Sequence, residues 1–142
     1  MNNVLAYKTT KDIIHGSEYK NIEREARKSH NRIASHTKRN PYIKSKYFKN
    51  EKIFLNYFWN VLHQRNWQDR KRRLIYYDCA IDLLRNTTLA SYTSQDPDDP
   101  NLLQHEFYGI TENGREFVVH VREDKRNDRK SFMSVFPPRQ KK

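Results

Sequence analysis

The chain has few of the residues that build several common kinds of functional site. Its 142 residues include one cysteine, Cys79, and three glycines. A single cysteine excludes an internal disulfide and a zinc site made of several thiolates, and it fits a reducing compartment such as the cytoplasm. Glycines at positions 16, 109 and 114 cannot form a P-loop or a GxGxxG turn, so we expect no nucleotide cofactor.

Long apolar runs and catalytic signatures are also missing. No 18 consecutive apolar residues occur, and the start MNNVLAYKTTKDIIHG lacks the apolar core of a signal peptide, so we expect no membrane span and no secretion. There is no GxSxG, CxxC, HxxxH or HxH spacing. We therefore expect no acyl-transfer site, no metal and no cofactor, with Cys79 a small buried side chain rather than a nucleophile.

What the chain has in excess is positive charge. Lys and Arg number 28 against 17 Asp and Glu, a net charge of +11, which favours a polyanionic partner, nucleic acid first. The charge is uneven: residues 7–73 carry 18 basic and 6 acidic side chains, residues 74–124 carry 3 and 10, and residues 125–142 carry 7 and 1. Two basic segments that meet in space would form one phosphate-binding surface.

Length and composition predict one domain. With 35% hydrophobic and 13% aromatic residues, the chain can build a small core of large rings. We divide it into an arm at 1–17, a helical part at 18–88, a loop at 89–104, an antiparallel sheet at 105–138 and a basic tail at 139–142.

The helical part predicts three helices. Charged helix formers with a sparse apolar stripe predict an exposed helix over 18–36, which Pro41 follows as a breaker. Apolar residues at 53, 54, 57, 58, 61 and 62 predict a core helix that begins near Glu51 with Asn50 as its cap. Asp69 is placed to begin a third helix, which ends near Asn86.

The C-terminal part changes to a period of two. Asn113-Gly114 between two alternating segments predicts a β-hairpin with a two-residue turn. In that register Glu106, Tyr108 and Ile110 share the core face with Phe117, Val119 and Val121. The open face then pairs Phe107 with His120 and His105 with Arg122. A third strand over 131–136 places Phe132, Ser134 and Phe136 on one face. The fold class is α+β, with N-terminal helices followed by a small curved antiparallel sheet.

An open sheet face with His120, Arg122 and Ser134 on a basic protein suits phosphodiester cleavage. RNA carries its own nucleophile, the 2′-hydroxyl, so an acid, a base and a cation suffice without metal. The sequence alone singles out no glutamate as the general base.

The C-terminal run FYGITENGREFVVHVREDKRNDRKSFMSVFPP, with the upstream stretches HNRIASHTKRNPYI and RRLIYYDCAIDLLRNT, resembles the barnase/EndoU/colicin/RelE-type ribonuclease toxin superfamily, especially phage-associated members. The resemblance covers roughly residues 30–138. It implies metal-independent RNA cleavage. It also implies that Ser134 is the hydroxyl residue of the last strand, that His36 is the helix-end histidine, and that Arg115 or Arg122 is the phosphate-binding cation.

The sequence thus predicts a metal-independent endoribonuclease, a toxin or phage-borne effector. The expected catalytic residues are His36, His120, Arg122 and Ser134. The expected RNA-binding residues are Lys38, Arg39, Lys44, Lys46, Arg72, Arg73, Arg115 and Phe107. Two alternatives stay open: a non-catalytic nucleic-acid-binding module in which Phe107, Phe132 and Phe136 stack on bases, and a basic domain that binds an acidic protein such as an antitoxin or immunity protein.

Overall fold

The computed structural model describes residues 5–138, which form four helices and one seven-stranded sheet. The predicted basic tail at 139–142 lies outside the described residues. The helices are α1 (Tyr19–Ala34), α2 (Asn56–Leu62), α3 (Trp67–Leu74) and α4 (Tyr77–Asn86). The strands are β1 (Tyr7–Lys8), β2 (Tyr42–Ser45), β3 (Glu51–Phe54), β4 (Tyr92–Gln95), β5 (Leu102–Ile110), β6 (Glu116–Asp124) and β7 (Arg129–Phe136).

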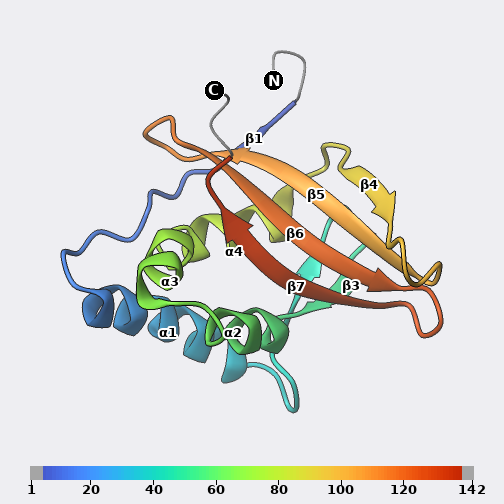
Figure 1. Cartoon of the computed structure of the whole chain (residues 1–142), viewed down its shortest axis with the longest axis horizontal. Helices are drawn as coiled ribbons and strands as arrows, with labels where there is room; N and C mark the ends of the chain where they lie inside the picture. The colour runs from blue at the N-terminus through green and yellow to red at the C-terminus, as the bar shows by residue number, and fades with distance from the viewer. Residues whose placement is uncertain (1–4, 139–142) are drawn as a thin grey trace.

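The sheet is mixed and curled around the helices. Its strand order is β1-β5-β6-β7-β3-β2, with β4 paired to β5. The β1–β5 and β3–β7 pairs are parallel, and the others are antiparallel. In Figure 1, β5, β6 and β7 lie in front of α4, while α2 and α3 lie beside β7. The α+β class is confirmed, but the sheet is larger than predicted and includes strands that precede or interrupt the helices.

Residues 42–54 form a strand pair instead of the start of a helix. Lys49 and Asn50 adopt φ values of 56° and 66°, so Asn50 belongs to the β2–β3 turn and does not cap a helix. Ile53 is fully buried, and it pairs with Lys130 at the edge of β7. The apolar spacing around Ile53 fits a helix or a strand, and pairing with β7 decides between them.

The predicted third helix is two helices, α3 and α4. Asn66, not Asp69, is the N-cap of α3, and its side-chain oxygen accepts from the Asp69 backbone nitrogen at 2.9 Å. The predicted loop at 89–104 contains β4, which pairs with β5. The described part of the predicted arm is fixed to α4, since the Tyr7 and Thr9 hydroxyls donate to Asp82 at 2.9 and 2.6 Å.

The β5–β6 hairpin differs from its predicted register by one residue. Its turn has three residues, because the Thr111 nitrogen donates to the Arg115 oxygen and Gly114 adopts a φ of +89°. Glu106 therefore pairs with His120, and Gly109 pairs with Phe117. A slip of one residue exchanges the two faces of a strand. As a result, Glu106 and Tyr108 lie on the open face of the sheet.

The main correction that follows from this register concerns the position of Phe107. It is 2% exposed and packs edge-on against Tyr47, with ring centroids 5.0 Å apart. The prediction that Phe107 binds RNA is wrong, because its ring lies in the core. Phe132 is also fully buried, stacked on Phe58 at 4.6 Å.

Helices and sheet share one aromatic-rich core. Cys79 lies inside it with no exposed surface, and burial raises the pKa of its thiol to about 12. Its burial confirms the prediction that Cys79 is a small buried side chain, and a thiol with such a pKa is a poor nucleophile at neutral pH. No helix within residues 5–138 is both long enough and apolar enough to span a bilayer.

Candidate active site on the open face of the sheet

Three polar side chains form a row across the open face of the sheet. Glu106 on β5 lies opposite His120 on β6, and His120 lies opposite Ser134 on β7. A β-bulge makes the last pairing: Val121 pairs with Phe132, so Met133 is the extra residue that lets Ser134 face His120. Bulges of this kind redirect side chains and are common beside active sites. We call Glu106, His120 and Ser134 the catalytic row, after the role proposed for it below.

Both ring nitrogens of His120 are engaged. The Gln104 side-chain amide donates to Nδ1 at 3.0 Å, so the proton of the neutral ring lies on Nε2, which donates to Glu106 Oε2 at 2.9 Å. Neither nitrogen is directed at Ser134. The row is therefore not a serine–histidine–acid triad, whose histidine must accept the hydroxyl proton.

Glu106 accepts a second hydrogen bond from its own strand. The Tyr108 hydroxyl donates to Oε1 at 2.5 Å. This bond, followed by burial, raises the pKa of Tyr108 to about 12, so Tyr108 remains a neutral donor. The predicted register placed Glu106 on the core face, whereas Glu106 lies on the open face. The signal that could have found it is the alternation of buried Phe107 with polar neighbours in β5.

Aromatic rings and arginines surround the row. The Phe136 ring lies edge-on to His120, with centroids 4.9 Å apart. The Arg73 guanidinium from α3 lies 5.3 Å from the Phe136 ring, and the Arg122 guanidinium lies 5.2 Å from the Tyr57 ring. Burial, followed by the charge of Arg65, lowers the pKa of Arg73, and Asp69 opposes this shift. An arginine remains a cation under such conditions, so Arg73 is positively charged beside Phe136, and Arg122 is a second cation two residues along β6 from His120.

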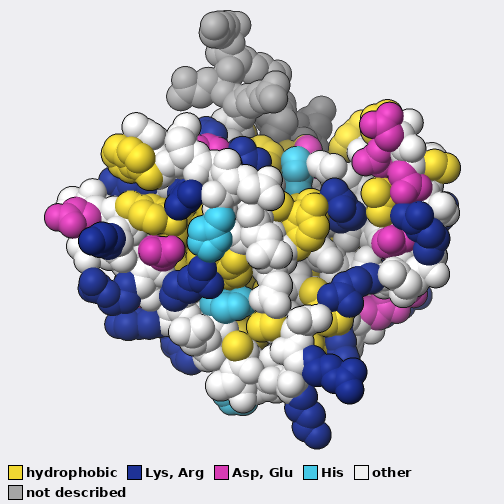
Figure 2. Space-filling view, turned by 60° about the horizontal axis from the view of Figure 1, so that its bottom comes forward, with side chains coloured by type: hydrophobic (Ala, Val, Ile, Leu, Met, Phe, Trp, Pro, Cys, Tyr) yellow, Lys and Arg dark blue, Asp and Glu magenta, His cyan; other side chains and the backbone are white. Residues whose placement is uncertain are grey.

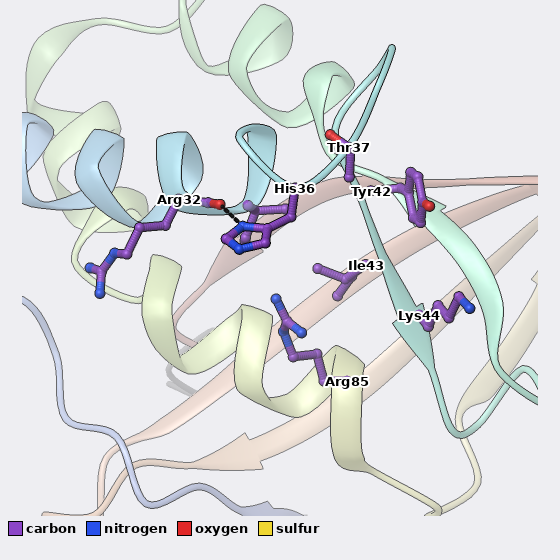
Figure 3. A pocket seen from close by; sticks show the side chains of 8 residues that line it. Arg32, His36, Thr37, Tyr42, Ile43, Lys44 and Arg85 are labelled. Atoms are coloured by element: carbon purple, nitrogen blue, oxygen red, sulfur yellow. Dashed lines mark hydrogen bonds between the residues drawn. The ribbon is translucent and has the colours of Figure 1, made fainter.

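His36 lies in a separate pocket and not in this row. The pocket has a volume of about 480 Å³ and is formed by the end of α1, β2 and α4. Its charged lining residues are Arg32, Lys44 and Arg85, and Figure 3 shows the Arg85 guanidinium pointing toward the His36 ring. The Nδ1–H of His36 donates to the Arg32 carbonyl at 2.8 Å. Of the four predicted catalytic residues, the structure brings together His120, Arg122 and Ser134.

The remaining predicted RNA-binding residues fall into three groups. Lys38, Arg39, Lys44 and Lys46 lie exposed on the α1–β2 loop, β2 and the turn after it, whereas Arg115 lies at the β5–β6 turn. Arg72 and Arg73 lie on α3, where both contact Asp69. Figure 2 shows Lys and Arg side chains along both lower margins of the view, with hydrophobic and histidine side chains between them.

Acidic side chains gather elsewhere. Most of those visible in Figure 2 lie at its right margin, the side on which Figure 1 places the β4–β5 and β6–β7 turns. Within residues 5–138, no three His, Cys, Asp or Glu side chains are grouped so as to hold a metal ion.

Comparison of the chain with protein-family models, curated proteins and solved structures finds no match. The function is therefore inferred from the geometry of the open face.

Proposed function

We propose that the protein is a metal-independent endoribonuclease whose active site is the catalytic row. One observation carries the proposal: a carboxylate and an imidazole joined at 2.9 Å lie on an open sheet face, with Arg122 two residues along β6 from the imidazole and the Arg73 guanidinium over the Phe136 ring that contacts it. These groups supply a proton acceptor, a proton donor and positive charge, which are the requirements for cleaving RNA through its 2′-hydroxyl.

Each residue has a defined part in the proposed reaction. Glu106 accepts the proton of the 2′-hydroxyl, whose oxygen attacks the phosphorus. His120, as the imidazolium, donates its Nε2 proton to the departing 5′-oxygen, and in this state the Gln104 amide presents its oxygen, which accepts from Nδ1–H. Arg73 and Arg122 stabilise the charge on the phosphoryl oxygens. Tyr108 and Gln104 hold Glu106 and His120 in place through their hydrogen bonds, and Ser134 contacts the substrate beside His120.

The test is RNA cleavage in EDTA by the whole chain, followed on a denaturing gel. The wild type is expected to cut RNA and to leave 2′,3′-cyclic phosphate ends, and it is expected not to cut the same sequence with 2′-O-methyl groups. General acid–base groups contribute about 10²- to 10⁴-fold, so His120→Ala and Glu106→Gln should each slow cleavage at least about 100-fold. His63→Ala, at an exposed histidine after α2, is the matched control.

Two results would overturn the proposal. Cleavage that requires Mg²⁺ would exclude the catalytic row as the whole machinery. RNA that is bound but left intact would favour the non-catalytic nucleic-acid-binding module. Thermal unfolding of each variant separates loss of chemistry from loss of fold.

The proposal extends to the setting in which such an enzyme acts. A basic ribonuclease of this size is suited to a role as a toxin or phage-borne effector, acting on RNA in the cytoplasm. An acidic antitoxin or immunity protein would then be its natural inhibitor, because it would compete for the same positive surface.

A further inference from the structure

A second row of side chains continues from the catalytic row across the outer face of the sheet. Arg122 on β6 pairs with Ser131 on β7, Ser131 pairs with Phe54 on β3, and Phe54 pairs with Tyr42 on β2. Directly paired residues on neighbouring strands share a face. All four therefore point to the same side of the sheet.

This face is continuous with the proposed active site. Arg122 lies two residues beyond His120 on β6, about 7 Å along the strand and on the same face. From Arg122 to Tyr42 the row crosses three strand spacings, roughly 14 Å. A polynucleotide cut at His120 would thus have an extended surface on which to lie.

Cations lie over aromatic rings along this row. The distances from cation to ring centroid are 5.2 Å for Arg122 and Tyr57, 3.9 Å for Arg129 and Phe54, and 4.5 Å for Lys52 and Tyr42. We call these six residues the aromatic–cation track. Tyr57 is 39% exposed, and Lys52 and Arg129 are also exposed, so these three side chains are accessible from solvent.

The nearby carboxylates are engaged by a different cation. Lys130, which is only 3% exposed, donates to Glu51 at 2.6 Å and lies 3.6 Å from Asp128. Lys52 and Arg129 line a hollow of about 510 Å³ with these two acids and Phe54. Lys44 also lines the hollow, so three cations face two acids there, and the charge that the track presents outward is positive.

We propose that the aromatic–cation track binds single-stranded RNA and leads it away from the catalytic row. The proposal names the substrate class of the proposed ribonuclease and rests on that function. Phosphates pair with the cations, while unpaired bases stack on exposed rings and guanidinium planes. Bases in a duplex are stacked on one another and have no free face for such rings, so the track selects single strands.

At its β2 end the track meets the pocket that contains His36. Tyr42 and Lys44 line that pocket, and Lys44 pairs with Lys52 across β2 and β3. The strand of RNA therefore continues over β2, and a phosphate enters the pocket beside His36 and Arg85. His36 acts there as a binding residue.

The experiment measures binding without cleavage. Fluorescence anisotropy with a 2′-O-methyl oligonucleotide, single-stranded or as a duplex, gives the affinity of the full chain in EDTA. Lys52→Gln/Arg129→Gln should weaken single-strand binding about tenfold. Lys20→Gln/Arg24→Gln removes the same charge from exposed positions on α1 and should change affinity less than twofold. Tyr57→Leu should weaken single-strand binding alone, whereas Trp67→Leu, at another exposed ring, should not.

Three results would overturn the track. The first is an equal loss in the two double variants, which would indicate only net charge. The second is duplex binding as tight as single-strand binding. The third is equal competition by a poly-glutamate peptide of matched charge, which would favour an acidic protein as the partner.

These experiments distinguish failure of the ribonuclease proposal from failure of the track proposal. If wild-type RNA is cut in EDTA but Lys52→Gln/Arg129→Gln binds normally, the ribonuclease stands and the track is wrong. If RNA stays intact but the track variants bind weakly as expected, the track stands as a single-strand-binding surface and the ribonuclease is wrong.

Discussion

His120 and His36 have charged neighbours of opposite sign. His120 donates to a carboxylate at 2.9 Å on the sheet face, whereas His36 lies among Arg32, Lys44 and Arg85. A histidine beside a carboxylate is suited to proton transfer, and one among cations is suited to binding a phosphate. The two residues should therefore affect different kinetic constants.

We predict that His120→Ala lowers kcat at least about 100-fold with little change in KM. His36→Ala should raise KM several-fold and leave kcat within about twofold, because it removes binding shared by ground state and transition state. Initial rates on a fluorogenic RNA measure both constants. Equal loss of kcat in the two variants would indicate that His36 takes part in the chemical step.

A third histidine contributes to stability. His30 is 7% exposed, and its Nδ1 accepts from the Trp59 indole at 3.1 Å. Burial, followed by the charge of Arg27, lowers the pKa of His30 below its ordinary value of 6.5. The unfolded chain therefore binds a proton more readily than the folded chain. Stability that is present above pH 6.5 is lost as the pH falls below it.

We predict that the free energy of unfolding decreases between pH 7 and pH 5, with His30 contributing at most about 1.4 kcal/mol per pH unit. His30→Gln keeps an acceptor for Trp59, so it should make this dependence shallower. His63→Gln, at an exposed histidine, should not. Urea denaturation at several pH values gives the slopes, and identical slopes in both variants would assign the acid sensitivity elsewhere.

At the scale of elements, Gly109 and Gly114 of the β5–β6 hairpin are each restricted to glycine by a different physical cause. A Cβ at Gly109 would lie 2.3 Å from Phe117 Cζ and 2.8 Å from Leu83 Cδ1, so the core leaves no space for it. Gly114 has open space around it but a φ of +89°. One position is limited by packing and the other by backbone conformation.

We predict that Gly109→Ala destabilises the protein by about 1–3 kcal/mol and Gly114→Ala by about 1–2 kcal/mol. Asparagine distinguishes the causes. Gly114→Asn should recover part of the loss, because Asn tolerates positive φ, whereas Gly109→Asn should be worse than Gly109→Ala. Denaturant midpoints measure all four variants, and recovery by Asn at position 109 would contradict the packing argument.

The elements also show what local patterns can predict. The helix over 19–34 was predicted within two residues at each end, because its charged helix formers and apolar stripe fit one period only. Ile53 and Phe54 fit two periods, and only pairing with β7, distant in sequence, makes them a strand. Asn113-Gly114 suits turns of two or three residues. Because the sequence does not decide between these turns, the predicted register exchanged the two faces of β5. It placed Phe107 on the open face and Glu106 on the core face.

Contacts between segments distant in sequence also limited how much of the candidate site could be predicted. The grouping of His120 and Arg122 on one face was predictable, because Phe117, Val119 and Val121 identify the core face of β6. Ser134 shares that face only through the bulge at Met133, which separates it from buried Phe132 and which the sequence did not predict. Arg73 reaches the Phe136 ring from α3, and Tyr57 reaches Arg122 from α2. Their contribution depends on how α2 and α3 pack beside β7, which no spacing within either helix encodes.

At the scale of the whole molecule, the net charge of +11 is less informative than its distribution. The acidic turns lie at one side of the molecule, and the track and the His36 pocket present cations on the surface leading from the catalytic row. Binding of a polyanion should therefore depend on a few cations, and salt should act on association more than on chemistry.

We predict that raising NaCl from 50 to 200 mM lowers kcat/KM on single-stranded RNA but leaves kcat within about twofold. Four phosphate contacts give a slope of about −2.8 for log affinity against log salt, or roughly a 50-fold loss over this range. Lys52→Gln/Arg129→Gln removes two of the proposed contacts, so its slope should be shallower by about 1.4, while Lys20→Gln/Arg24→Gln keeps the wild-type slope. A slope of log affinity against log salt near zero in the wild type would argue against a nucleic-acid substrate. Each phosphate that pairs with a cation releases condensed counterions, whatever the sequence of the RNA.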